Sequence, residues 1–204
     1  MRRIVIVDYG SGNLRSVQRG FERAGFAATI TRNPNVVSEA THLVVPGVGA
    51  FSDCMDNLEK LGLLTPIKES ILSEKPYLGI CLGLQILFSE GTEFGARPGL
   101  GIIPGQVVRF PKNDLKVPHM GWNQIQIEKE TSILKDIPGE TYFYFVHSYY
   151  GAPEDTAYMA TTTDYGVRFA SSVSQGRLFA CQFHPEKSQE MGRRLLENFA
   201  NLTV

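Results

Sequence analysis

The sequence has little of what a protein needs to bind nucleic acid or a membrane. Its 20 lysines and arginines are balanced by 21 aspartates and glutamates, so the formal net charge over 204 residues is only −1. A chain with this balance has no strong field to attract either kind of partner. The longest early apolar run, residues 4–7, ends at Asp8 and is far too short for a signal peptide or a membrane span. We therefore expect a cytoplasmic protein that binds neither nucleic acid nor membrane.

Cysteine is scarce as well, and nucleotide-binding loops are missing. The three cysteines, Cys54, Cys81 and Cys181, are too few for a disulfide framework, and no spacing among them is that of a metal-ligand pair. No Walker loop and no G-x-G-x-x-G segment occurs in the sequence. We expect no metal, no cofactor and no nucleotide site, and we interpret Cys54 and Cys181 as structural.

The length and the pattern of the first half indicate one α/β domain over residues 1–204. With 43% hydrophobic residues, the chain can bury a full core without a second domain. Residues 3–7 predict a strand buried on both faces, and residues 14–24 predict a helix after it. Residues 26–31 and 42–45 predict two further strands. This alternation favours an open, mostly parallel sheet with helices on both faces.

The second half changes to short strands joined by turns. From residue 105 onwards the pattern is more antiparallel than β–α–β. The predicted strands cover residues 107–110, 122–127, 142–146, 157–163, 167–173 and 177–182. Before them, residues 89–99 read as a loop. After them, residues 188–202 predict an amphipathic helix that packs back on the sheet.

One segment, residues 79–85, has residue types that suggest covalent chemistry. It reads Gly-Ile-Cys-Leu-Gly-Leu-Gln, after an apolar strand and before a helix that residues 82–88 can start. A cysteine between two glycines at such a junction is typical of a nucleophile elbow, whose strained and crowded backbone excludes side chains at the glycines. We expect the Cys81 sulfur to be exposed and its thiolate to be favoured by the helix start. The alternative is a buried structural cysteine.

A glycine-rich loop, residues 46–51, follows the predicted third strand. It precedes a helix that Ser52 or Asp53 is expected to cap. In a doubly wound sheet, ligands lie beyond the carboxyl ends of the strands, so this loop and Cys81 belong at the same edge. Its N–H groups, together with that of Leu82, are candidates for an oxyanion hole. The alternative is a tight turn without a chemical role.

His184 and Glu186 stand just before the last predicted helix. In extended backbone, side chains two residues apart point to the same side, so the carboxylate can orient the imidazole and stabilise its protonated form. A base with its orienting acid is what a cysteine nucleophile requires. The alternative is a surface histidine near a helix start. We interpret His42 as structural, and either role stays open for His119 and His147.

Together these segments resemble the class I, triad-type glutamine amidotransferase family, whose two signature blocks match residues 79–85 and 184–186. The resemblance covers essentially the whole chain and implies a flavodoxin-like α/β fold. Further blocks are similar to those of the glutaminase subunits of imidazole glycerol phosphate synthase, namely residues 8–14, 46–51, 119–123 and 144–149.

The resemblance implies a role for each matched residue. Cys81 attacks the γ-amide of glutamine, His184 with Glu186 protonates the departing ammonia, and water releases glutamate from a thioester. The residues matched to the oxyanion hole are Val48 or Gly49, after a peptide rotation, and Leu82. The positions matched to glutamine contacts are Gln85, Glu93, Ser148 and Tyr149. For Glu93, which lies in a predicted loop, the alternative is a solvated carboxylate.

A chain that releases ammonia but has no acceptor site of its own implies a partner. By resemblance, this partner is a HisF-type (β/α)8-barrel cyclase subunit, bound as a heterodimer, which uses the ammonia in histidine biosynthesis. The residues matched to the interface or to the ammonia passage are Asn13, Trp122, Tyr144 and Lys187.

Three other functions stay open. A freestanding thiol amidase, such as a γ-glutamyl hydrolase, has the same nucleophile but acts without a partner. A redox-sensing or interaction protein uses an oxidisable cysteine and has no need of an oriented base such as His184. Glutaminase subunits of other synthases share the two signature blocks but not the opening loop at residues 8–14.

Overall fold

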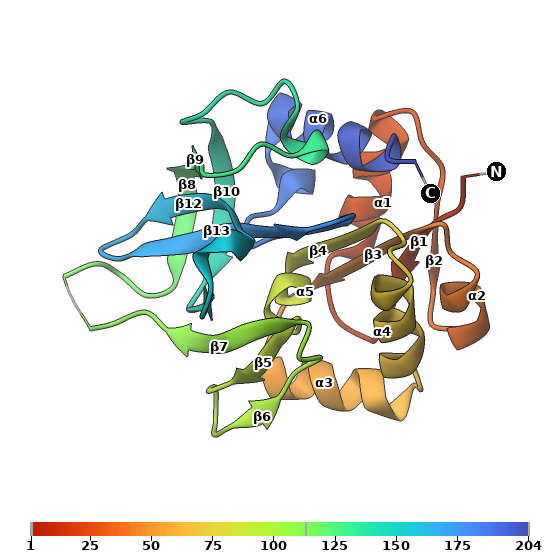
Figure 1. Ribbon diagram of the computed structural model, residues 1–204, viewed down its shortest axis with the longest axis horizontal. Coiled ribbons are helices and arrows are strands. Elements are labelled where there is room, and N and C mark those ends of the chain that lie inside the picture. Colours follow the sequence, from red (N-terminus) through yellow and green to blue (C-terminus); the bar gives the residue numbers. More distant parts are fainter. Residues whose placement is uncertain (1, 113, 204) are drawn as a thin grey trace.

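The computed structural model describes residues 2–112 and 114–203 and is built on one large sheet (Figure 1). The eight strands of this sheet are, in spatial order, β2 (Ala28–Thr31), β1 (Ile4–Val7), β3 (His42–Gly47), β4 (Tyr77–Cys81), β14 (Leu178–Cys181), β13 (Arg168–Gln175), β12 (Met159–Asp164) and β9 (Gln126–Ile127). The first five of these strands run parallel to one another, and each of the last three is antiparallel to the strand before it. The predicted α/β class, mostly parallel with antiparallel strands in the second half of the chain, is confirmed.

Helices cover both faces of this sheet (Figure 1). The helices are α1 (Leu14–Arg23) and α6 (Gln189–Ala200) on one face, and α2 (Pro34–Ser38), α3 (Phe51–Lys60) and α4 (Leu64–Leu72) on the other. Side chains alternate along a strand, so Ile4 and Ile6 pack into the core under α1 and α6, whereas Val5 and Val7 pack into the core on the opposite face. Strand β1 is therefore buried on both sides, which explains its unbroken apolar sequence.

Two smaller sheets complete the fold. In the first, β10 (Tyr142–His147) pairs antiparallel with β8 (His119–Gln124). The second contains, in spatial order, β11 (Tyr149–Pro153), β7 (Ile103–Arg109), β5 (Phe88–Gly91) and β6 (Arg97–Pro98). The remaining short elements are the one-turn helix α5 (Leu82–Gln85) and the 3-10 turns η1 (Ser132–Leu134), η2 (Thr156–Tyr158) and η3 (Pro185–Lys187).

The prediction for residues 82–99 is wrong after the first helical turn. Helix α5 ends at Gln85, and residues 88–91, expected in a helix and a loop, form strand β5. Phe88 is fully buried, and a β-carbon on Gly91 would lie 2.6 Å from the Phe51 ring. This strand exists because β7 pairs with it and α3 packs on it, and neither contact is visible in its local sequence.

Helix α3 begins at Phe51, two or three residues earlier than a cap at Ser52 or Asp53 implies, and neither of these residues caps it. Its cap position is Ala50, which has no side chain able to accept a hydrogen bond. Instead, the Phe51 N–H donates to Glu93 Oε2 over 2.9 Å. A carboxylate from a distant segment therefore supplies the cap, and it also places its negative charge at the positive end of the helix.

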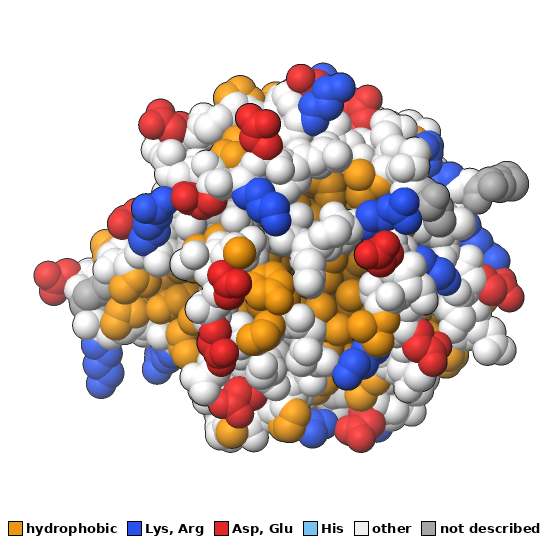
Figure 2. Space-filling model, in the orientation of Figure 1, with side chains coloured by type: hydrophobic (Ala, Val, Ile, Leu, Met, Phe, Trp, Pro, Cys, Tyr) orange, Lys and Arg blue, Asp and Glu red, His pale blue; other side chains and the backbone are white. Residues whose placement is uncertain are grey.

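The surface of the described residues carries charges of both signs. On the face shown in Figure 2, acidic and basic side chains are interspersed around smaller apolar areas. Within residues 2–112 and 114–203, no helix is both long enough and apolar enough to cross a membrane.

The close contact between α5 and β3 generates a stability prediction. A β-carbon on Gly83 would lie 1.7 Å from the Val45 carbonyl oxygen, so Gly83→Ala forces the elbow away from β3. We expect the free energy of unfolding to fall by at least about 2 kcal/mol in a urea titration. The matched control is Gly139→Ala, whose β-carbon meets nothing within 4 Å and whose effect should stay within about 0.5 kcal/mol. Equal unfolding midpoints for the two variants would contradict this packing.

Candidate active site

Cys81 lies at the predicted elbow between β4 and α5. Its backbone angles are φ 55° and ψ −104°, a conformation that a non-glycine residue adopts only at a cost of roughly 1–3 kcal/mol. The flanking glycines are required. A β-carbon on Gly79 would lie 2.4 Å from the Gly83 carbonyl oxygen, and a β-carbon on Gly83 would lie 1.7 Å from the Val45 carbonyl oxygen. The expectation of an exposed sulfur is wrong. Cys81 is only 6% exposed, since the elbow is covered by the residues that surround it.

His184 and Glu186 form a buried pair. Nδ1 of His184 lies 2.8 Å from Oε1 of Glu186, and their side chains are 3% and 1% exposed. Only His184 has the extended backbone that the sequence predicts, because Pro185 begins the turn η3 and Glu186 lies inside it. The turn still brings the carboxylate back to the ring. Since Nδ1–H donates to Glu186, the other nitrogen, Nε2, is free to act as acid or base, and it has no hydrogen-bond partner among the described residues.

The electrostatics of this pair favour a protonated imidazole. Burial by itself lowers the pKa of His184, but the neighbouring Cys81 sulfur and the Glu186 carboxylate outweigh it and raise that pKa to about 10. A protonated imidazole beside the Cys81 sulfur places a proton donor next to a nucleophilic atom, and the carboxylate holds the ring in place. This arrangement can attack a carbonyl carbon and protonate the group that leaves.

A pocket of about 280 Å³ opens next to Cys81 and collects most of the predicted site. Its lining residues are Val48, Gly49, Cys81, Leu82, Gln85, Glu93, Pro118, Val146, His147, Ser148 and Tyr149. The structure therefore brings together the predicted nucleophile, the predicted oxyanion residues and all four predicted glutamine contacts. Its volume suits a small molecule rather than a polypeptide.

Contacts with β4 and with the opening loop of the chain hold the glycine-rich loop against the elbow at Cys81. Gly47 pairs with Cys81 in the register of β3 and β4, and a β-carbon on Gly47 would meet the Tyr9 hydroxyl at 1.9 Å. The Ser11 hydroxyl donates to the Val48 carbonyl over 2.7 Å. Gly49 follows with φ +106°, which only glycine adopts readily. The opening loop of the chain thus fixes the direction of the Val48 carbonyl.

Two residues predicted to contact glutamine, Gln85 and Glu93, already form hydrogen bonds within the protein. The side-chain nitrogen of Gln85 donates to the Tyr149 carbonyl and to Gln182 Oε1, each over 3.0 Å. Glu93 lines the pocket while it caps α3, so it is not the solvated carboxylate that the sequence left open. Its second carboxylate oxygen can still face a ligand.

Sequence reasoning missed Gln182 and left His147 open. The Gln182 side-chain nitrogen donates to the Cys81 sulfur over 3.5 Å, and His147 lines the pocket. No local signal pointed to Gln182, because β14 ends at Cys181 and the chain bends at residues 182–183, so the alternation of an extended strand does not apply there. His42 is buried against Phe199 at the other end of the sheet, as its structural interpretation requires.

Three of the four residues expected at a partner interface lie together beside His184. The Trp122 and Tyr144 rings are 6.2 Å apart, Lys187 Nζ lies 5.3 Å from the Tyr144 ring centroid, and the Tyr144 ring is 6.5 Å from that of His184. Asn13 is exposed before α1, where its side chain forms no cap hydrogen bond. Met120 and Tyr142, 62% and 55% exposed, extend the apolar surface of β8 and β10.

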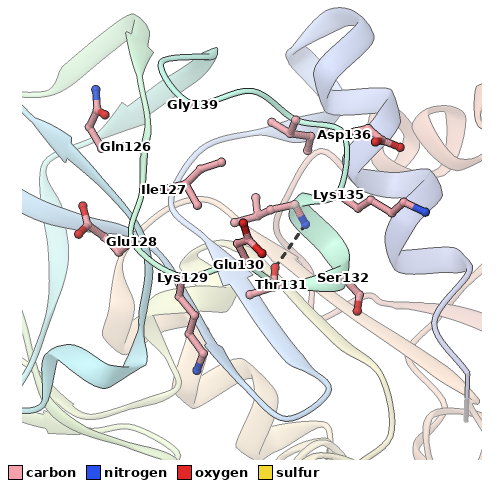
Figure 3. A pocket seen from close by; sticks show the side chains of 12 residues that line it. Gln126, Ile127, Glu128, Lys129, Glu130, Thr131, Ser132, Lys135, Asp136 and Gly139 are labelled. Atoms are coloured by element: carbon pink, nitrogen blue, oxygen red, sulfur yellow. Dashed lines mark hydrogen bonds between the residues drawn. The ribbon is translucent and has the colours of Figure 1, made fainter.

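A larger cleft of about 870 Å³ lies elsewhere, between β9 and the η1 turn (Figure 3). Figure 3 shows mainly charged and polar side chains around it, with Lys129 and Lys135 pointing away from its centre. None of its lining residues belongs to the predicted site. Among the described residues, no group of three or more His, Cys, Asp or Glu side chains is arranged to hold a metal ion.

The buried pair generates a titration prediction. Glu186→Gln removes the negative charge that stabilises the imidazolium, so the pKa of His184 should fall from about 10 toward the ordinary value of 6.5. The measurement is an NMR titration of the His184 ring carbon. Glu190→Gln, which removes an exposed carboxylate paired with Arg193, is the control and should leave the His184 pKa in place. An unchanged pKa in Glu186→Gln would show that the carboxylate only orients the ring.

Comparison with solved structures supports the fold. A chain described as a glutamine amidotransferase superimposes with a TM-score of 0.75 at 19% identity, covering 98% of this chain and 100% of the other. A chain from the structure of PurLQS from Thermotoga maritima gives a TM-score of 0.74 at 16% identity, covering 98% of this chain and 98% of the other.

Sequence comparison identifies the family as well as the fold. The sequence model described as glutamine amidotransferase class-I matches residues 5–202. The imidazole glycerol phosphate synthase subunit HisH of Syntrophotalea carbinolica is 54% identical over 205 residues, which cover 98% of this chain and 100% of the relative. The HisH subunit of Aquifex aeolicus is 50% identical over 198 residues, which cover 97% and 95%. The chain therefore belongs to the class I glutamine amidotransferase family.

Proposed function

We propose that this protein is the glutaminase subunit of an imidazole glycerol phosphate synthase and supplies ammonia for histidine biosynthesis. The observation that carries the proposal is that Cys81 lines a pocket of about 280 Å³ and has the buried His184–Glu186 pair beside its sulfur. It occurs in a chain that is 54% identical, over nearly its full length, to a subunit named for that synthase. The pocket has the size for a free amino acid.

The chemistry follows from the geometry of the three residues. The Cys81 thiolate attacks the γ-amide carbon of glutamine and forms a tetrahedral oxyanion. The His184 imidazolium gives its proton to the amide nitrogen, which leaves as ammonia, and a thioester remains. Neutral His184 then takes a proton from water, the hydroxide adds to the thioester, and glutamate departs as the thiolate is restored. Glu186 keeps Nε2 turned toward the sulfur in both halves.

The oxyanion donors are the Leu82 N–H and an N–H of the glycine-rich loop, from Val48 or Gly49. In the structure, the Val48 carbonyl is held by the Ser11 hydroxyl. We infer that a peptide of this loop rotates to complete the hole, which the glycine at position 49 permits. Until then, the developing negative charge lacks one donor, so turnover by the isolated chain is weak.

The remaining pocket residues bind the amino-acid end of glutamine. Gln85 has committed its N–H groups to the protein, so its oxygen is available to accept a hydrogen bond from the substrate. Glu93 offers a negative charge to the α-ammonium, and the backbone at Ser148 and Tyr149 lines the opposite wall. The neutral histidine of this wall, His147, adds no charge to the pocket.

The partner is a HisF-type (β/α)8-barrel cyclase that forms a heterodimer with this chain in the cytoplasm. Ammonia is volatile and basic, so it must pass directly to its acceptor. The exposed apolar side chains of β8 and β10, together with Lys187 and Asn13, form the proposed docking surface. An exposed tryptophan beside a catalytic histidine is the kind of anchor that protein interfaces use.

The proposal predicts how glutamate release depends on the partner. Release from glutamine should be slow for the isolated chain and rise strongly with the cyclase and its nucleotide ligand. Cys81→Ala should abolish it in every mixture, because the variant lacks the sulfur that attacks the amide carbon. Turnover that is equal with and without the cyclase would assign the chain to the freestanding amidases. If no glutamate is released in any mixture, the cyclase is not the partner, and the subunit of another synthase becomes the candidate.

The docking surface predicts a second effect. Trp122→Ala should weaken the complex with the cyclase at least about tenfold, measured by titration calorimetry, because a large aromatic anchor is lost. Leu72→Ala is the matched control, since Leu72 is 67% exposed on α4, away from β8 and β10. Equal affinities for the two variants would place the interface elsewhere.

A further inference from the structure

A continuous path of hydrogen bonds leads from strand β8 to the Cys81 sulfur. Its six links, in order, are Asn123 Nδ2 to His119 Nε2 (3.2 Å), His119 Nδ1 to His147 Nε2 (3.0 Å), His147 Nδ1 to the Tyr149 carbonyl (2.9 Å), Gln85 Nε2 to that same carbonyl (3.0 Å), Gln85 Nε2 to Gln182 Oε1 (3.0 Å) and Gln182 Nε2 to Cys81 Sγ (3.5 Å). The inner side chains are buried, with Gln182 fully so.

The histidine half of the path has one possible direction. Asn123 is fixed, because its oxygen accepts from the Gln124 N–H and its nitrogen donates to the Asp164 carbonyl. His119 must therefore accept at Nε2 and donate from Nδ1 to His147. His147 in turn accepts at Nε2 and donates from Nδ1 to the Tyr149 carbonyl.

Each of these histidines carries a single ring proton at neutral pH. Burial lowers the pKa of His119 to about 4. Burial likewise lowers the pKa of His147, to about 3. One proton on each ring is what the direction of this half of the path requires.

The glutamine half is equally constrained. The Tyr149 carbonyl can only accept, so Gln85 must turn its amide nitrogen toward it. The same nitrogen faces Gln182, which must then present its oxygen. A reversed Gln182 amide would set N–H groups against N–H groups. Its nitrogen is left facing Cys81, so the sulfur is forced to be an acceptor.

We propose that Gln182 is a positioning residue that holds the Cys81 sulfur as an anion aimed into the pocket, and that Gln85, itself oriented by the Tyr149 carbonyl, fixes the Gln182 amide for this task. A donor that cannot turn away stabilises a charged acceptor more than a neutral one. The strained backbone of Cys81 places the residue but leaves rotation about its Cα–Cβ bond unconstrained. The Gln182 donor, together with the His184 ring beside the sulfur, then defines where the sulfur lies. The inference deepens the proposed function and rests on Cys81 as its nucleophile.

The test is the pH dependence of Cys81 alkylation by iodoacetamide in the full chain, followed by mass spectrometry of the peptide that contains this residue. Gln182→Leu removes the donor, and Gln182→Glu keeps the shape but turns an acceptor toward the sulfur. We expect alkylation at pH 6 to slow about tenfold in Gln182→Leu and more in Gln182→Glu, with the midpoint of the profile moved to higher pH. Gln106→Leu, which removes an exposed Gln106–Glu90 contact, should match the unaltered protein.

The other titratable groups near Cys81 are unchanged in the Gln182 and Gln106 variants. They are His184, Tyr9 and Cys181. A shifted midpoint therefore reports on position 182 itself, whereas a purely structural role for Gln182 leaves the midpoint in place. Profiles of both Gln182 variants that coincide with that of the unaltered protein would overturn the proposal.

A second measurement needs no variant. In ¹⁵N spectra of the unaltered protein between pH 5.5 and 8, His119 and His147 should both carry their proton on Nδ1. A proton on Nε2 of either ring would reverse a link in the histidine half only, because the Tyr149 carbonyl still accepts from Gln85, so the positioning role is decided by the alkylation profiles. Glutamate release with the cyclase is scored separately. If glutamate release fails while the alkylation midpoint shifts in the Gln182 variants, the proposed function is wrong and the positioning role stands. If glutamate is released but the midpoint does not shift, only the positioning role is rejected.

Discussion

The approach of Gly83 to the Val45 carbonyl is the contact on which the site depends. With 1.7 Å between that oxygen and the place of a β-carbon, only glycine lets α5 lie directly on β3. The contact sets Cys81 at a sharp turn and simultaneously brings the loop after β3 beside it. If α5 moved outward to admit a methyl group, the sulfur and the glycine-rich loop would separate, and neither His184 nor the pocket could compensate.

The parallel sheet supplies the second level of organisation. Strands β3, β4 and β14 are neighbours, so the segments that follow them meet at one edge although they are distant in sequence. The first contributes the glycine-rich loop, the second Cys81, and the third His184 and Glu186. Burial of the last two makes their electrostatics strong, because little water is present to screen the charges. Rigid placement and weak screening together explain the strong interaction within this pair.

The sequence predicted what local pattern determines. The elbow at Cys81 and the His184–Glu186 pair are set by residues a few positions apart, and the parallel half of the sheet by unbroken apolar runs. The failures share a different cause. Strand β5, the cap of α3 by Glu93 and the bond from Gln182 to the sulfur are each made by partners more than ten residues away, so nothing in the local sequence indicates them. The burial of Cys81 was mispredicted for the same reason, since its covering residues come from other parts of the chain.

The double position of Glu93 links the pocket to the order of a helix. Its carboxylate closes the first turn of α3 and also lines the cavity. A cation that enters and draws this carboxylate toward itself leaves the Phe51 amide without an acceptor, so occupancy and fraying of that turn become thermodynamically linked. The linkage is reciprocal: whatever tightens the start of α3 loosens the hold on the cation by the same free energy. The affinity of the pocket for such a cation therefore includes the free energy of breaking the Glu93–Phe51 bond.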